Sequence, residues 1–106
     1  MNVDASTPVA IPSTSQPDSH TLEEVWSRVE ASRAPFCALS DSIWATPELN
    51  YDEVQSSGQI AAMLQKQRFR IERGIAGIPT AMVGEAGQGG PVIAILGEYN
   101  ALPGLS

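Results

Sequence analysis

The sequence predicts an α/β protein in which two helices precede three strands. Apolar residues recur at helical spacing before residue 68, and short strand-like runs separated by glycine follow it. Residues 1–20 differ from the rest, because they contain three prolines and many serines and threonines without an apolar period. We therefore expect a disordered tail over residues 1–20 and one small folded part over residues 21–106.

The first predicted helix begins at Thr21. Thr21 and Glu24 match a capping box, in which a hydroxyl and a carboxylate three residues later satisfy the first amides of a helix. Pro35 either kinks one long helix or starts a second one, and Pro47 ends the pattern. The apolar stripe has the i, i+3, i+4, i+7 spacing of a helix and consists of Leu22, Val25, Trp26 and Val29.

A second helix is predicted from near Asp52 to about Arg68. Val54, Ala61 and Leu64 give it an apolar face. Its interior contains a glycine, which lowers helix propensity without excluding the helix.

Three strands are predicted after the second helix. Phe69–Arg73 alternates apolar and charged residues, as a half-exposed strand does. Ile78–Val83 has a proline near its start, where the missing amide does least harm. Val92–Leu96 is apolar at every position, which is typical of a strand buried on both faces. Gly74–Gly77 is expected to form a turn, and Gly84–Gly90 a flexible loop.

Charge and composition argue against several classes of function. The chain carries 12 acidic and 6 basic residues, a net charge of −6, so nucleic acid is not an expected partner. No run approaches the ~20 apolar residues of a membrane span, so no membrane association is expected. The single cysteine, Cys37, excludes an intrachain disulfide. The N-terminus resembles neither a signal peptide nor a transit peptide, which favours a cytoplasmic location.

Several polar residues could carry chemistry, and each also has a structural interpretation. His20 falls in the predicted tail, where we interpret it as a solvated side chain rather than a metal ligand. Cys37 has no histidine base within reach, so we interpret it as a buried structural residue. Glu48, Asp52 and Glu53 could pair for acid–base catalysis, but carboxylates at this place more often cap a helix.

Glu98 and Asn100 stand just beyond the apolar run Val92–Leu96. Because side chains alternate along an extended chain, both should point to the same face. Sites in α/β proteins form beyond the carboxyl ends of strands, so this pair is the main candidate for a functional site. The alternative is a carboxylate and an amide that only hydrogen-bond a turn.

Three blocks of the sequence resemble one known family. The chain is similar over residues 21–106 to the zinc-type amidohydrolases and aminoacylases, a family of co-catalytic metallopeptidases, and most of all to its aminobenzoyl-glutamate hydrolase and dipeptidase branch. The blocks that carry the resemblance are Trp44–Glu53, Gly74–Ala81 and Ile95–Ser106, of which the last is the most specific.

The resemblance implies a fold and a reaction. The family has an α/β catalytic domain with a mixed sheet, interrupted by a smaller dimerisation domain, and this chain would be its truncated N-terminal part. The implied reaction is hydrolysis of the amide bond in N-acyl amino acids or dipeptide-like substrates. In such a reaction zinc or a similar divalent metal polarises the carbonyl and activates water, and a glutamate acts as general base.

The resemblance also implies roles for Glu98 and Asn100. Glu98 falls at the position of a metal-binding histidine, and the related branch already has glutamate there. Asn100 falls at the position of an aspartate that orients this ligand. Asparagine carries no negative charge and is a poor metal ligand, so Asn100 departs from the family pattern.

The family's remaining metal ligands and its general base have no counterpart in these 106 residues. We therefore expect that the chain binds no metal by itself and is inactive alone. A family dimer interface would lie in a domain that the chain does not contain. The alternative is a short non-catalytic protein, or pseudoenzyme, that binds a partner through an unpaired sheet edge.

Overall fold

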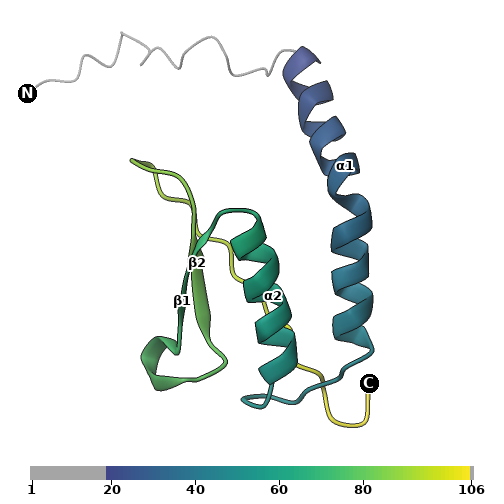
Figure 1. Cartoon of the computed structure of the whole chain (residues 1–106), viewed down its shortest axis with the longest axis vertical. Coiled ribbons are helices and arrows are strands. Elements are labelled where there is room, and N and C mark those ends of the chain that lie inside the picture. Colours follow the sequence, from purple (N-terminus) through teal and green to yellow (C-terminus); the bar gives the residue numbers. More distant parts are fainter. Residues whose placement is uncertain (1–18, 106) are drawn as a thin grey trace, which may run out of the picture. The chain divides into compact units, whose positions relative to one another are not determined.

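The computed structural model describes residues 19–105 (Figure 1). The chain divides into two units. The first unit is Met1–Pro35 and the second is Phe36–Ser106. Five elements follow in order: α1 (Ser19–Trp44), α2 (Val54–Lys66), β1 (Arg70–Arg73), the short 3-10 helix η1 (Ile75–Gly77) and β2 (Met82–Glu85). The predicted fold class, α/β with helices before strands, is confirmed.

Helix α1 is one continuous helix of 26 residues with Pro35 inside it. Pro35 therefore does not start a second helix, although its missing N–H leaves one carbonyl of the preceding turn without its usual donor. The helix begins at Ser19, so Thr21 and Glu24 lie within it and the predicted capping box at Thr21 is wrong. Residues 1–18, which hold most of the predicted tail, lie outside the described residues.

The second unit is built on α2 and a two-stranded antiparallel sheet. β1 and β2 pair from Arg70 opposite Glu85 to Arg73 opposite Met82, and α2 packs against both strands (Figure 1). Gly74 and Gly77 adopt left-handed backbone angles, φ 72° and 75°, in the connection. Glycine adopts such angles without steric cost, so it suits this turn.

Gly84 lets the sheet approach α2 closely. A Cβ atom at this position would lie 3.1 Å from Cδ1 of Ile71 and 3.2 Å from Cδ1 of Leu64. Leu64 belongs to α2 and Ile71 to β1, so the missing side chain of Gly84 makes room for both. A glycine inside a strand often marks such an approach.

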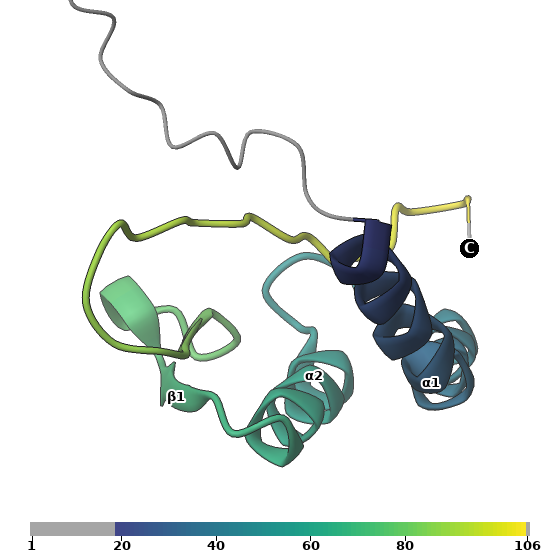
Figure 2. The same ribbon diagram turned by 90° about the horizontal axis from the view of Figure 1, so that it is seen from above.

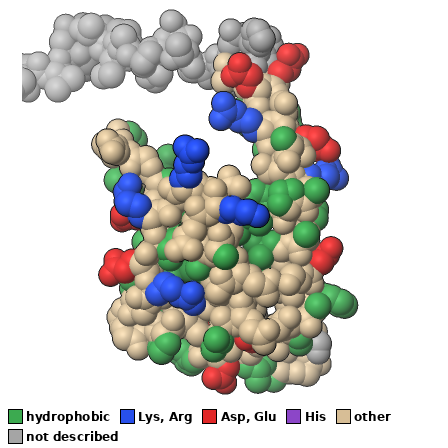
Figure 3. Space-filling view, viewed as in Figure 1, with side chains coloured by type: hydrophobic (Ala, Val, Ile, Leu, Met, Phe, Trp, Pro, Cys, Tyr) green, Lys and Arg blue, Asp and Glu red, His purple; other side chains and the backbone are tan. Residues whose placement is uncertain are grey.

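The buried residues of the described chain are mostly polar. Ala61 is the one hydrophobic residue among them, at 3% exposure. Large apolar side chains instead reach the surface, as the face in Figure 3 shows. This pattern fits part of a larger domain, because a domain of ordinary size buries its apolar side chains. The buried polar residues are Glu53, Ser56, Ser57 and Thr80.

The third predicted strand, Val92–Leu96, is not formed among the described residues. The segment is extended and runs without a neighbouring strand (Figure 2). Val92, Ile93, Ile95 and Leu96 are 83–96% exposed, so the expected burial on both faces is wrong for this chain. A strand depends on a pairing partner as well as on its own residues, and the described residues place none beside this segment.

The second strand lies later than predicted. β2 begins at Met82, whereas the pattern placed a strand over Ile78–Val83. The Ala81 amide donates to the Ile78 carbonyl at 3.0 Å, so Pro79 and Thr80 form a turn instead.

Neither helix of the described residues has the long, nearly uncharged apolar stretch that crossing a membrane requires.

Candidate functional site

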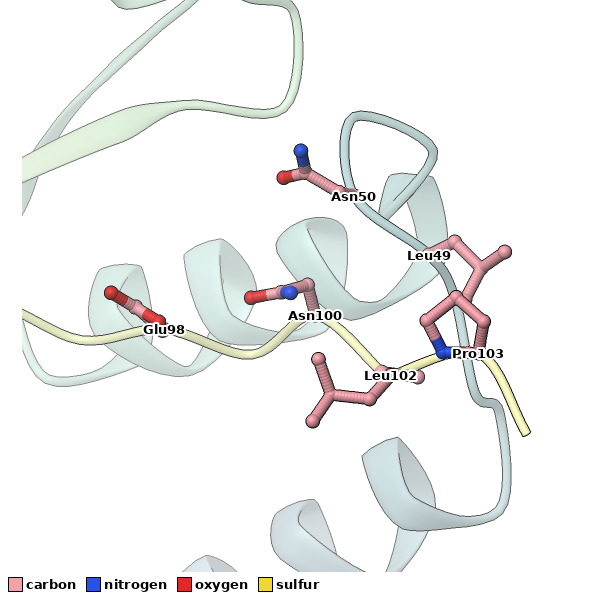
Figure 4. Close-up of a pocket in the computed structure, with 7 residues that line it drawn as sticks. Leu49, Asn50, Glu98, Asn100, Leu102 and Pro103 are labelled. Carbon is pink, nitrogen blue, oxygen red and sulfur yellow. The ribbon is translucent and has the colours of Figure 1, made fainter. Parts of the chain in front are cut away.

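A pocket of about 540 Å³ lies between two segments of the second unit (Figure 4). The first segment follows α1 and contributes Leu49 and Asn50. The second belongs to the C-terminal block and contributes Glu98 and Asn100. The side chains of Asn50, Glu98 and Asn100 extend toward the same side in Figure 4. Ala101, Leu102 and Pro103 complete the lining and give it an apolar part.

Two hydrogen bonds hold the C-terminal segment of this pocket. The Ala101 amide donates to the carbonyl of Glu48 at 2.7 Å, which joins the two pocket segments. The Tyr99 hydroxyl donates to the carbonyl of Thr80 at 2.6 Å, which fixes the segment to the β1–β2 connection. Asn100 lies between these two anchored residues.

Glu48 also caps α2 with its side chain. Its carboxylate accepts hydrogen bonds from the amides of Gln55, at 2.9 Å, and Ser56, at 2.6 Å. These amides belong to the first turn of the helix, where donors have no partner within the helix. The hydrogen bond from Gln55, followed by that from Ser56, lowers the pKa of Glu48. The capping interpretation is confirmed for Glu48, whereas Glu53 makes no side-chain cap.

Two charged groups, Glu53 and Arg73, act on the Tyr99 phenol, and Arg73 also belongs to a short chain of hydrogen bonds. Arg73 donates to the Ser57 hydroxyl at 3.1 Å, and that hydroxyl donates to the Val54 carbonyl at 3.1 Å. Burial raises the pKa of Tyr99, the nearby Glu53 carboxylate adds to the rise, and Arg73 opposes it. The phenol therefore stays protonated at neutral pH and remains a hydrogen-bond donor.

Two curated proteins are related to this chain. One subunit of the p-aminobenzoyl-glutamate hydrolase of Escherichia coli (strain K12) is 42% identical over 78 residues, which are 74% of this chain and 16% of that protein. Thermostable carboxypeptidase 2 of Saccharolobus solfataricus is 36% identical over 63 residues, 58% of this chain and 16% of that protein. Over these residues the chain is similar to one protein named as a hydrolase and one named as a carboxypeptidase. It spans about a sixth of the length of each relative. No family model and no solved structure matches it.

Both residues that the sequence predicted for the site, Glu98 and Asn100, line the pocket. Glu98 is exposed and Asn100 is half-buried. Reasoning from the sequence did not identify Asn50, which lies in another of the blocks that resemble the family. It also did not identify Tyr99, which anchors the C-terminal segment through its hydrogen bond to the Thr80 carbonyl. The alternation that pointed to residues 98 and 100 could have shown that residue 99 faces the scaffold.

Cys37 does not line this pocket. Cys37 is exposed on α1, so its interpretation as a buried residue is wrong. The backbone of His20 is helical, and its side chain lies outside the described residues.

The described residues do not fit a metal centre. Among the side chains that the structure describes, those of residues 21–105, no three His, Cys, Asp or Glu converge on a position for an ion. In the pocket, Glu98 supplies the one carboxylate and Asn100 and Asn50 supply neutral amides. A protein zinc site takes three or four His, Cys or carboxylate ligands, and this set is too small.

Proposed function

We propose that the chain forms part of the substrate pocket of a metal-dependent amidohydrolase that cleaves N-acyl amino acids or dipeptide-like amides. The observation that carries this proposal is the joint placement of Glu98 and Asn100 in one pocket. The relatives named as a hydrolase and a carboxypeptidase support the class of reaction. Zinc or a similar divalent ion would supply Lewis acidity in the complete site.

The pocket offers contacts of two kinds to such a substrate. The Asn100 amide can donate a hydrogen bond to a substrate carbonyl or carboxylate, and its neutrality avoids repelling an anionic amino acid. Leu102 and Pro103 offer an apolar surface to the acyl or aryl group. p-Aminobenzoyl-glutamate combines an aryl amide with an anionic amino acid, so it is a suitable test ligand for both contacts.

Glu98 would place its carboxylate beside the amide bond of a substrate bound in the pocket. A carboxylate accepts hydrogen bonds and can orient water or contribute a metal ligand. The described residues supply no second carboxylate there. We therefore expect the purified 106-residue chain to bind the amide without hydrolysing it.

Calorimetric titration of the purified chain with p-aminobenzoyl-glutamate tests this function. Replacing Asn100 by alanine should weaken binding by about fivefold, since a neutral hydrogen bond contributes roughly 1 kcal/mol. Gln65→Ala is the matched control, because Gln65 is exposed on α2 and does not line the pocket. Equal affinities for wild type, Asn100→Ala and Gln65→Ala would contradict the proposal.

A second candidate function is association with another copy of the chain through Val92–Leu96. The large apolar side chains of this segment are exposed, and none of its backbone groups hydrogen-bonds within the described residues. Exposed, unpaired strands favour pairing with another chain. An antiparallel pair centred on Ala94 would place Val92 opposite Leu96. Glu98 would then lie opposite Gly90, which avoids contact between like charges.

Analytical ultracentrifugation over a range of concentrations tests this second function. Ile95→Lys should abolish association, whereas Leu105→Lys, an exposed change outside the segment, should leave it intact. A chain that stays monomeric at all concentrations would exclude association through Val92–Leu96.

A further inference from the structure

The C-terminal pocket segment alternates between two roles. Glu98 and Asn100 line the pocket, whereas the intervening residue Tyr99 turns its side chain to the scaffold and donates to the Thr80 carbonyl. In an extended chain successive side chains point in opposite directions, so the orientation of Tyr99 fixes that of its two neighbours. A rotation that released the tyrosine would also move both pocket residues.

Few contacts hold this segment in its orientation. Within the described residues, two hydrogen bonds join residues 91–105 to the rest of the chain, one from Tyr99 and one from the Ala101 amide. The residues before Tyr99 are extended and exposed, so they add little restraint. The two bonds flank Asn100 on either side.

We infer that Tyr99 is a positioning residue, which uses its hydroxyl bond to the Thr80 carbonyl to aim Glu98 and Asn100 into the pocket. The inference rests on the proposed function for the claim that the pocket binds a substrate. The orientation of Glu98 and Asn100 rests on the two hydrogen bonds. Glu48 acts with it, because its carbonyl holds Ala101 while its carboxylate holds the start of α2.

The surroundings of the Tyr99 phenol keep it protonated at neutral pH, so its hydroxyl can donate a hydrogen bond. Glu53, which is buried, and Arg73 are the charged groups that act on Tyr99, from the residue before α2 and from β1 respectively. Burial and the Glu53 carboxylate disfavour the phenolate, so the pKa of Tyr99 is raised. At pH values below the ordinary tyrosine pKa, the folded chain therefore keeps the hydrogen bond from Tyr99 to the Thr80 carbonyl. It loses this bond as pH rises through the raised pKa of Tyr99 in the folded chain.

Amide exchange and chemical shifts of ¹⁵N-labelled protein test the inference. Tyr99→Phe keeps the ring and removes the bond, so exchange of the Ala101 amide should accelerate by about tenfold and the Asn100 resonances should shift. The α2 amides should exchange as in the wild type. Tyr51→Phe is the matched control, since Tyr51 is exposed and should leave residues 98–101 unchanged.

A pH titration supplies a readout that a purely structural role of the ring would not give. In Tyr51→Phe, Tyr99 is the remaining tyrosine, and the chemical shift of its Cζ carbon reports its ionisation. The chemical shifts of Asn100 should change over the same pH range. Replacing the remaining tyrosine by 3-fluorotyrosine lowers the phenol pKa at nearly constant size, so this transition should move to lower pH. The fluorinated chain also serves if Tyr99→Phe does not fold.

The two proposals fail separately in these measurements. Unchanged exchange at Ala101 in Tyr99→Phe, or Asn100 resonances that ignore Tyr99 ionisation, would overturn the positioning role. A chain that shows both responses but binds no p-aminobenzoyl-glutamate would support the positioning role and contradict the proposed function.

Discussion

Glu48 and Ala101 are joined by a backbone hydrogen bond of 2.7 Å, although 52 residues lie between them in the sequence. The same Glu48 caps α2 with its carboxylate, through the amides of Gln55 and Ser56. One residue thus ties the pocket segment to the start of a helix. This relationship explains how two distant blocks of the chain can form one wall of a site.

Removing the Glu48 carboxylate should lower stability in a pH-dependent way. The pKa of Glu48 in the folded chain is below its ordinary value of 4.5. A lowered pKa contributes stability that is present above the unfolded value and is lost as pH falls through the folded value. Thermal melts should therefore give a lower Tm for Glu48→Gln than for wild type at pH 7, with the difference shrinking below pH 4.5.

Glu72→Gln is the control for this change, because Glu72 is exposed on β1. A Tm difference between wild type and Glu48→Gln that stays constant from pH 7 to pH 3 would be inconsistent with a capping carboxylate.

Two glycine-to-alanine changes should have opposite effects on stability. Gly84→Ala places a Cβ atom 3.1–3.2 Å from Ile71 and Leu64 and should cost about 1–3 kcal/mol by overpacking. Gly58→Ala meets nothing within 4 Å inside α2 and should stabilise by roughly 0.5–1 kcal/mol. Urea unfolding measures both, and equal effects would argue against close contact between α2 and the sheet.

The two buried serines of α2 should also respond differently. The Ser57 hydroxyl accepts a hydrogen bond from Arg73 and donates one to the Val54 carbonyl, so Ser57→Ala should cost about 1 kcal/mol through the loss of these hydrogen bonds. The Ser56 hydroxyl makes no hydrogen bond of standard geometry within the described residues, although it helps to lower the pKa of the Glu48 carboxyl group. Ser56→Ala should therefore cost less than Ser57→Ala in the same urea experiment, and an equal or larger loss would contradict this order.

Introducing a second carboxylate should improve divalent-ion binding at the pocket. Asn100→Asp places two carboxylates on one lining, at residues 98 and 100, which resembles the donors of oxygen-ligated metal sites. Mn²⁺ should then broaden the resonances of residues 98–101 at lower concentration than in the wild type. Gln88→Asp adds the same charge on an exposed loop and should not reproduce the effect. Equal broadening in both variants would indicate only a change in net charge.

The sequence predicted those elements whose signals are local. Helical spacing identified α1 and α2, and alternation in Phe69–Arg73 identified β1. The strand prediction at Val92–Leu96 was wrong, because strand formation depends on a neighbour that composition cannot supply. The later start of β2 reflects a local turn at Pro79 and Thr80, closed by the hydrogen bond from the Ala81 amide to the Ile78 carbonyl, which the pattern of Ile78–Val83 did not distinguish from a strand.

The candidate site was predicted in the same uneven way. Alternation beyond an apolar run pointed to Glu98 and Asn100, and both line the pocket. Asn50 could not be inferred, because it reaches the pocket through the long-range bond between Glu48 and Ala101. Tyr99 was missed because its anchoring bond is to a backbone carbonyl 19 residues away, which the sequence does not reveal.

The most direct test of the central claim is a ¹⁵N chemical-shift titration of the chain with p-aminobenzoyl-glutamate. We predict shifts concentrated at residues 49–50 and 98–103, the two segments that line the pocket, and a titration midpoint at higher ligand concentration in Asn100→Ala. Shifts that cluster elsewhere, or that titrate with the same midpoint in Asn100→Ala, would contradict the claim that Glu98 and Asn100 form a substrate pocket.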